Sequence, residues 1–106
     1  MKVKPWGSEE ILECNDSYTL KRIFMKEGKR CSLQLHESKH ETIYILSGKM
    51  RLIYEDTETN LYEGEFFVIE NGKVHRMCGI TDCVYIEVST SQLDDIIRFE
   101  DDFGRK

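Results

Sequence analysis

Short runs of β-branched and aromatic residues recur along the chain, and each run is bounded by glycine, asparagine, aspartate or charged residues. Side chains of the first kind pack well on a pleated, half-buried surface, and the bounding residues favour turns. Many short strands at such spacing are typical of an antiparallel sandwich or barrel. The pattern predicts an all-β domain with strands over residues 18–25, 31–36, 42–46, 49–54, 65–69 and 84–88.

The segments between the runs predict how the strands are connected. Tight turns are expected at residues 47–49 and 70–73, where glycine follows serine or asparagine. Residues 56–60 are polar and are expected to form a loop at the tip of a hairpin. Helix signals are confined to the tail, where Ser91 could cap a short turn before residues 96–99.

Length and charge limit the classes of function. A chain of 106 residues, of which 40% are hydrophobic, is sized for one domain, expected over residues 1–106. It has neither an apolar run long enough to span a membrane nor a secretory leader, so a cytoplasmic location is expected. The net charge is −5 with scattered lysines and arginines, which argues against nucleic acids and anionic membranes as partners. A small-molecule or protein partner remains.

The first histidine lies in a run that alternates between two faces. In residues 32–36 the strand period of two places Leu33 and Leu35 on one face, and Gln34 and His36 on the other. If that second face lines a barrel interior, an amide and an imidazole are buried together. Their burial is costly unless they find partners, and a metal ion is one effective partner.

Two further residues extend this candidate site. Glu41 begins the next apolar run, where a carboxylate is costly to bury unless it faces a cation. His75 follows the turn at 70–73, and hairpin geometry could bring it back against the first pair. Taken singly, each has an ordinary explanation as a surface residue or a satisfied core residue. Together with Gln34 and His36 they predict a site for one divalent metal ion.

The spacing of these residues resembles the two motifs of the cupin superfamily. The first motif consists of a glycine, two histidines, a glutamate and a glycine at fixed intervals. This chain keeps the intervals, with glutamine in place of the first histidine, at Gly28, Gln34, His36, Glu41 and Gly48. The second motif consists of a glycine, a proline, a glycine, a histidine and an asparagine. Its spacing is matched, with glutamate in place of proline and glycine in place of asparagine, by Gly64, Glu70, Gly72, His75 and Gly79. The resemblance implies a double-stranded β-helix, or jelly-roll barrel, with Gln34, His36, Glu41 and His75 as the metal ligands.

Further segments are similar to the cupin domain of type II mannose-6-phosphate isomerases, in which a Ser-Leu-Gln-x-His run also leads into the first motif. The likeness includes residues 4–8 (KPWGS), 21–23 (KRI) and 94–105 (DDIIRFEDDFGR). In that family the cupin usually follows a nucleotidyltransferase domain. The stretch between His36 and Glu41 departs from the family, which usually carries two more histidines and an arginine there. This departure bears on mannose 6-phosphate as the substrate more than on the fold or the metal.

The resemblance implies an aldose–ketose isomerase that acts on a phosphorylated or activated sugar. The metal ion (Zn, Mn, Fe, Co or Ni, which this ligand set does not distinguish) would polarise the carbonyl and stabilise an enediolate. His40 and Lys39 are the catalytic candidates, His40 as the base that moves a proton between two carbons and Lys39 as a cation for the phosphate. The candidates for substrate binding are Arg30 and Arg76 as further phosphate ligands, and Tyr44 and Tyr85 through their hydroxyls. For each, an exposed loop residue, a solvated charge or core packing is the ordinary alternative.

Other functions and an assembly are compatible with the same barrel. An Fe(II)-dependent dioxygenase would use open coordination positions for oxygen and substrate, whereas a non-catalytic cupin would bind a sugar or metabolite without turnover. Small cupins seldom stay monomeric, so the resemblance also implies a homodimer. Residues 1–7 and 98–106 could supply its exchanged edges, and the charged residues 100–106 are expected to cover the surface or contact the partner.

Overall fold

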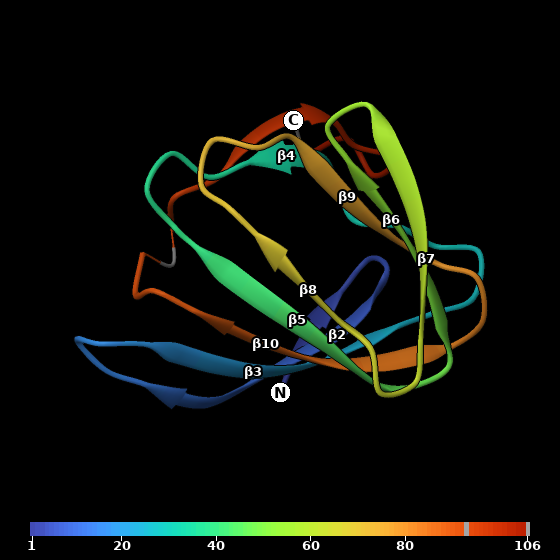
Figure 1. Ribbon diagram of the computed structural model, residues 1–106, viewed down its shortest axis with the longest axis horizontal. Helices are drawn as coiled ribbons and strands as arrows, with labels where there is room; N and C mark the ends of the chain where they lie inside the picture. The colour runs from blue at the N-terminus through green and yellow to red at the C-terminus, as the bar shows by residue number, and fades with distance from the viewer. Residues whose placement is uncertain (93, 106) are drawn as a thin grey trace.

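The computed structural model describes residues 1–92 and 94–105, whose strands form two antiparallel sheets that face each other (Figure 1). The strand order of the six-stranded sheet is β1 (Lys2–Lys4), β2 (Gly7–Cys14), β3 (Thr19–Met25), β10 (Cys83–Ser89), β5 (Glu41–Ser47) and β8 (Phe66–Ile69). The order of the five-stranded sheet is β11 (Ile97–Glu100), β4 (Leu33–Leu35), β9 (His75–Gly79), β6 (Lys49–Tyr54) and β7 (Thr57–Tyr62). The chain crosses repeatedly between the layers, and the space between them is the interior of a barrel.

Side chains alternate along the strands, so that every second residue points into the barrel. In β5, Ile43 and Ile45 are fully buried, whereas Tyr44 between them is exposed. The five-stranded sheet contributes Met50 and Leu52 from β6 to the same core. Complete burial of each such side chain contributes about 1.5–3 kcal/mol, so the hydrophobic effect holds the two sheets face to face.

The turn between β5 and β6 requires glycine. Gly48 has a φ of 82°, and a Cβ at this position would lie 2.1 Å from the carbonyl oxygen of Asp82. Any other residue would therefore be strained and would also clash with backbone. The expected turn at residues 70–73 is also present, with Gly72 at a φ of 78°.

The six predicted strands are present, with ends that differ from the prediction by at most two residues. The hairpin expected around residues 56–60 is present between β6 and β7, but its turn consists of Glu55 and Asp56, so the loop expected at 57–60 is wrong and β7 occupies Thr57–Tyr62. β7 is an exposed edge strand in which only Leu61 is buried, so its sequence lacks an apolar signal. β1, β2, β9 and β11 are also additional to the prediction, and their sequences are rich in charged and polar residues.

Both terminal segments complete sheets of their own chain. β1 pairs with β2 at the edge of one sheet, and β11 pairs with β4 at the edge of the other. The short turn expected before residues 96–99 includes Leu93, which lies outside the described residues, and Ile97–Glu100 after it form a strand. Within the described residues, no helix has the length and apolar character needed to span a membrane.

Candidate metal centre

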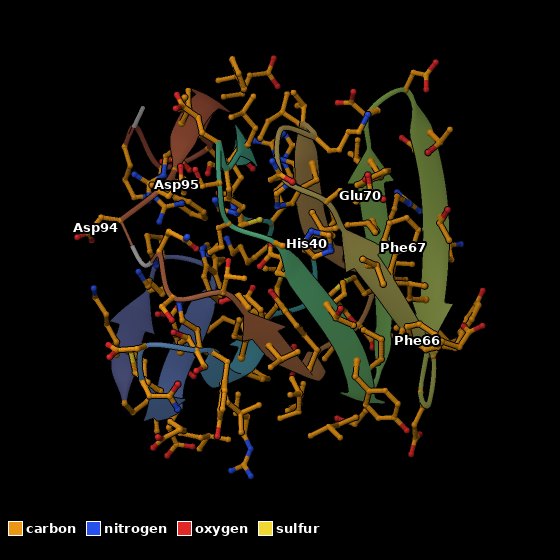
Figure 2. The ribbon with its side chains drawn as sticks, turned by 60° about the vertical axis from the view of Figure 1, so that its left-hand side comes forward. His40, Phe66, Phe67, Glu70, Asp94 and Asp95 are labelled. Carbon is orange, nitrogen blue, oxygen red and sulfur yellow. The ribbon has the colours of Figure 1, made fainter. Side chains whose placement is uncertain are left out.

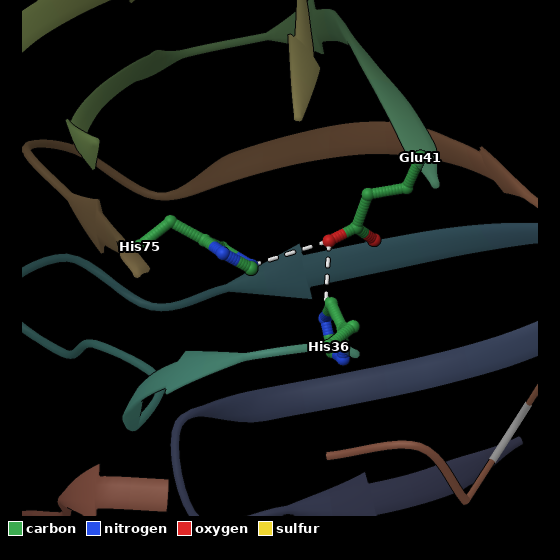
Figure 3. Close-up of side chains that lie close together, drawn as sticks. All are labelled: His36, Glu41 and His75. Carbon is green, nitrogen blue, oxygen red and sulfur yellow. Dashed lines mark ion pairs between the residues drawn. The ribbon is translucent and has the colours of Figure 1, made fainter. Parts of the chain in front are cut away.

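Three strands bring one polar side chain each to the same buried point in the barrel (Figure 3). His36 directly follows β4, Glu41 is the first residue of β5 and His75 is the first residue of β9. Their exposed fractions are 3%, 1% and 0%, respectively. The two histidines come from the five-stranded sheet and the glutamate from the six-stranded sheet, so the site forms only when the two layers pack together.

The three side chains converge on one carboxylate oxygen. Oε1 of Glu41 lies 3.2 Å from Nε2 of His36 and 3.2 Å from Nε2 of His75. One nitrogen or oxygen from each of the three residues lies within 4.8 Å of the others. Ligand atoms around one small cation are separated by such distances, since each bond to the ion is about 2.0–2.2 Å long.

Backbone carbonyls set the orientation of both imidazole rings. Nδ1 of His36 donates to the carbonyl oxygen of Asp95 over 2.5 Å, and Nδ1 of His75 donates to that of Lys73 over 2.9 Å. A carbonyl can only accept, so each Nδ1 carries a proton, and Nε2 is the ring atom that faces Glu41. Carbonyls in this position orient metal-binding histidines in many proteins.

The facing atoms lack partners within the described part of the chain. Nε2 of both histidines and both carboxylate oxygens of Glu41 are buried without a hydrogen-bond partner there. Buried acceptors that face one another are unfavourable unless a cation lies between them, and either protons on the rings or a metal ion would supply it. A single divalent ion satisfies all three residues at once, so the donor set fits a metal.

Gln34, the fourth predicted ligand, lies beside this cluster. It is 9% exposed and stands directly opposite His75 in the register between β4 and β9, so both side chains point to the same face. Its Oε1 accepts a hydrogen bond of 2.6 Å from Oγ of Ser32. An amide oxygen has a second lone pair, so this bond leaves ligation by Gln34 open, and that role stays a prediction.

A second carboxyl group shares the interior with Glu41. Burial would raise the pKa of Glu41, but the facing His36 and His75 side chains hold its pKa well below the usual range. For Glu87 on β10, burial together with the negative charge of Glu41 raises the pKa well above its usual range. The site therefore contains two neighbouring carboxyl groups whose pKa values are shifted in opposite directions. The sequence analysis missed Glu87, although the period of two from the buried Tyr85 could have indicated it.

A cavity of about 520 Å³ opens beside the cluster. Gln34 and His36 line it from one sheet, and Tyr85 and Glu87 line it from the other. Its volume lies within the range of about 300–1,000 Å³ usual for small-molecule sites. A molecule in this cavity would approach a bound ion from the side of Gln34 and His36.

The predicted catalytic and tyrosine residues divide between this cavity and other surfaces. Lys39, which is 6% exposed, and the fully buried Tyr85 both line the cavity. His40 is exposed at the start of β5 (Figure 2) and lines a separate, more open hollow of about 290 Å³, which Glu41 also borders. Tyr44 is exposed on the outer face of the sheet, because it lies three positions, an odd number, after the inward-facing Glu41.

Arg30 and Arg76 are bound to the chain's own C-terminal segment. Arg30 forms a bidentate ion pair with Asp102, with N–O distances of 2.7 and 3.0 Å. Arg76 donates from Nε to the carbonyl oxygen of Cys31 over 2.8 Å, and from Nη2 to that of Glu100 over 3.2 Å. Neither arginine lines the cavity that Lys39 lines. Both hold the tail against the five-stranded sheet.

Comparison with known proteins relates the whole domain to one family. Residues 1–101 match the family model described as "Mannose-6-phosphate isomerase C-terminal". The chain belongs to this family. It is 33% identical over 107 aligned residues to the xanthan biosynthesis protein XanB of Xanthomonas campestris pv. campestris (strain B100), which covers 96% of this chain and 23% of that protein. It is 31% identical to the mannose-1-phosphate guanylyltransferase ManC of Salmonella typhimurium (strain LT2), with 96% and 22% covered.

The comparisons also confirm the predicted architecture. The structure of KdgF from Halomonas sp. superposes with a TM-score of 0.82 at 19% sequence identity, covering 90% of this chain and 87% of that one. The two sheets form the double-stranded β-helix of the cupins, as the motif spacing predicts. Because the chain spans less than a quarter of the curated relatives named above, the resemblance concerns their C-terminal domain.

Proposed function

We propose that the protein is a metal-dependent isomerase that interconverts the aldose and ketose forms of a sugar phosphate. The observation that carries this proposal is the convergence of His36, Glu41 and His75 beside a cavity large enough for a sugar phosphate. Membership of a family named for mannose-6-phosphate isomerase supports the reaction class. The altered stretch between His36 and Glu41 leaves room for a sugar other than mannose.

One divalent metal ion is part of the proposal, held by His36, Glu41 and His75, with Gln34 as the fourth ligand. Nitrogen and oxygen donors of this kind suit Zn, Mn, Fe, Co or Ni alike. When bound, such an ion acts as a Lewis acid that polarises a carbonyl oxygen and stabilises negative charge on it.

The chain itself supplies groups for proton transfer. Isomerisation moves one proton between two adjacent carbons, so the group that carries it must lie within hydrogen-bond reach of the sugar. Glu87 is buried on the cavity wall, and burial together with the negative charge of Glu41 raises its pKa, which suits a group that carries a proton. Lys39 and Tyr85 line the same wall and would hold sugar oxygens or the phosphate. His40 would act only on a sugar that also reaches the second hollow.

The proposal is tested by proton exchange. Protein whose metal content has been measured is incubated in deuterated water with a panel of hexose and pentose phosphates. Deuterium at C1 or C2 of one substrate is expected, and His36→Ala should abolish both the exchange and the metal content. His40→Ala should keep its metal, and a loss of exchange in that variant would identify His40 as the group that moves the proton.

Other outcomes of the same experiment point to other functions. If every sugar phosphate stays inert with each of the candidate metals, the isomerase proposal is wrong. Binding without turnover would then indicate a metabolite-binding cupin, and oxygen consumption with Fe(II) would indicate a dioxygenase.

The proposed assembly is a homodimer, and the outer face of the six-stranded sheet supports it. Apolar side chains on three adjacent strands are between 39% and 63% exposed there: Tyr44, Leu46, Phe66, Val68 and Val88. Strands lie about 4.8 Å apart and rise about 3.3 Å per residue, so three strands of about six residues cover roughly 14 by 20 Å. Two such faces in contact would form the apolar centre of an interface, to which flanking surface must add before it reaches the size of stable interfaces, about 1,200 Å² of total buried surface. The terminal segments pair within their own chain, which argues for this face over exchanged edges.

Charge placed on that outer face should separate the dimer. Phe66→Glu is expected to shift the mass measured by light scattering from a dimer to a monomer, because it buries a carboxylate in an apolar contact. Thr59→Glu on the exposed β7 is the matched control and should leave the mass unchanged. A wild-type chain that is monomeric at high concentration would contradict the dimer. The cytoplasmic location stays a prediction.

A further inference from the structure

On the wall of the cavity beside the metal centre, the buried Lys39 and the half-buried Arg98 form no ion pair within the described residues. Of the other basic residues on this wall, Lys21 pairs with Glu9 at 3.2 Å and Arg105 pairs with Asp101 at 2.7 Å, whereas Lys2 is exposed and Lys4 is half-buried. Lys39 is 6% exposed, yet no carboxylate among residues 1–92 and 94–105 lies within 4.0 Å of its amino group. Arg98 has no ion pair with those residues either, and its buried Nε lacks a hydrogen-bond partner.

The acidic residues on the cavity wall form no ion pair with these two cations. Glu9 pairs with Lys21, and Glu10 pairs with Arg22 at 3.5 Å. The charge of Lys39 acts on Glu41 and on Glu87, yet neither carboxyl group lies within 4.0 Å of its amino group, and Asp94 is exposed. A cation that is withdrawn from water without a directly bonded carboxylate is costly, so an anion supplied from outside would stabilise Lys39 and Arg98.

Strand register places Arg98 in the same row as the metal-binding residues. Arg98 on β11 stands opposite Gln34 on β4, and Gln34 stands opposite His75 on β9. Directly opposed residues of antiparallel strands point to the same face, so all three point into the barrel. Two strand spacings separate Arg98 from His75, which is about 10 Å between their backbones. A sugar phosphate that spans the distance from Arg98 to His75 would have its anionic group at Arg98 and its carbonyl end near the proposed ion.

Lys39 reaches the cavity from a loop that is held by the same tail. The carboxylate of Asp95, labelled in Figure 2, accepts hydrogen bonds from the backbone amides of Glu37, Ser38 and Lys39 over 2.9, 2.7 and 2.9 Å. These bonds depress the pKa of Asp95, so it stays ionised and keeps the loop in place at neutral pH. The segment that contains Arg98 therefore also sets the position of Lys39.

We infer that Arg98 and Lys39 form the subsite for the phosphate group of the substrate, in place of Arg30 and Arg76. Arginine offers a planar fork to two phosphate oxygens, and lysine adds a point charge. The assignment of the phosphate to a sugar rests on the proposed function. The anion-binding site itself depends only on the two unpaired cations and the cavity between them.

Calorimetric titration of the metal-loaded protein tests this inference. The probes are mannose 6-phosphate, inorganic phosphate and unphosphorylated mannose. Arg98→Gln and Lys39→Gln should each weaken binding of both phosphates by about 10- to 100-fold, the range for one charged hydrogen bond. Binding of mannose should not change. Arg51→Gln, which removes an exposed arginine of β6, is the matched control and should bind like the wild type.

Three results would overturn the subsite: no binding of either phosphate to the wild type, unchanged binding in both variants, or an equal loss for mannose and mannose 6-phosphate. Metal content and thermal unfolding check that each variant folds, and Lys39→Gln decides the case if Arg98→Gln does not fold. Proton exchange separates this inference from the proposed function. Weakened phosphate binding without exchange in the wild type keeps the subsite and removes the isomerase. Exchange in the wild type, together with a KM for the sugar phosphate that neither variant changes, keeps the isomerase and removes the subsite.

Discussion

The two ends of the barrel interior contrast sharply although the same strands build them. Along β5, Glu41 and Ile45 point to the same side, roughly 13 Å apart at the usual rise per residue. Around Ile45 the interior is closed by Met25, Met50 and Leu52, all of which are fully buried. Around Glu41 it contains His36, His75 and other polar groups whose burial is costly. The apolar end supplies the stability that allows the polar end to hold a ligand site.

Truncation at the apolar end should have the largest effect on stability. Ile45→Ala leaves a cavity in a fully buried position and should lower the free energy of unfolding by about 2–5 kcal/mol. Because Ile45 does not contact the proposed ion, this loss should be the same with metal and with a chelator. Urea unfolding under both conditions measures the loss of free energy. A loss that differs between metal and chelator would show that the two ends are not independent.

Metal should stabilise the protein through the polar end alone. Ligands that bind only the folded state add about 2.7 kcal/mol at a hundredfold excess over Kd and about 4.1 kcal/mol at a thousandfold excess. This increment should appear in the wild type and in Ile45→Ala but disappear in Glu41→Gln, whose amide is a weaker ligand. Thermal unfolding with and without metal checks it. An increment that survives in Glu41→Gln would place the ion elsewhere.

The polar end was predictable as far as local spacing determines it. His36, Glu41 and His75 follow from motif intervals, and the period of two correctly turns Gln34 inward. The same period, applied from Glu41, would have turned Tyr44 outward. The fold followed likewise from the apolar runs, except where an exposed edge such as β7 carries no apolar signal.

The partners of the arginines could not be predicted in this way. Arg30 is neutralised by Asp102, 72 positions away in sequence, whereas Arg98 has no such pair within the described chain. All the arginines carry the same charge in the sequence, and only the packing of the tail on the five-stranded sheet distinguishes them. Which cations remain available for a ligand is therefore a property of tertiary structure.

Titration of Glu87 should make the stability of the polar end depend on pH. Burial and the charge of Glu41 raise its pKa in the folded protein above the ordinary value of 4.5. The folded state therefore binds more protons than the unfolded state between 4.5 and the raised pKa, and stability from this group is lost as the pH rises through that window. In metal-free protein, Glu87→Gln should remove this loss. Its stability relative to the wild type should thus increase from pH 4 to pH 7, as urea unfolding would show. A difference in stability between the two proteins that does not change with pH would mean that Glu87 is ionised or exposed.

The smallest expected effect concerns the hydroxyl that holds Gln34. Ser32→Ala removes the 2.6 Å hydrogen bond to Oε1 of Gln34, a loss of about 0.5–1.5 kcal/mol for a typical buried bond. In metal-free protein the amide oxygen is then buried without a partner. If Gln34 is a ligand, the ion satisfies that oxygen, and the substitution should cost less with metal than without it. Urea unfolding of both proteins under both conditions gives the four free energies needed. Equal costs would remove Gln34 from the ligand set and leave His36, Glu41 and His75 as a three-residue site.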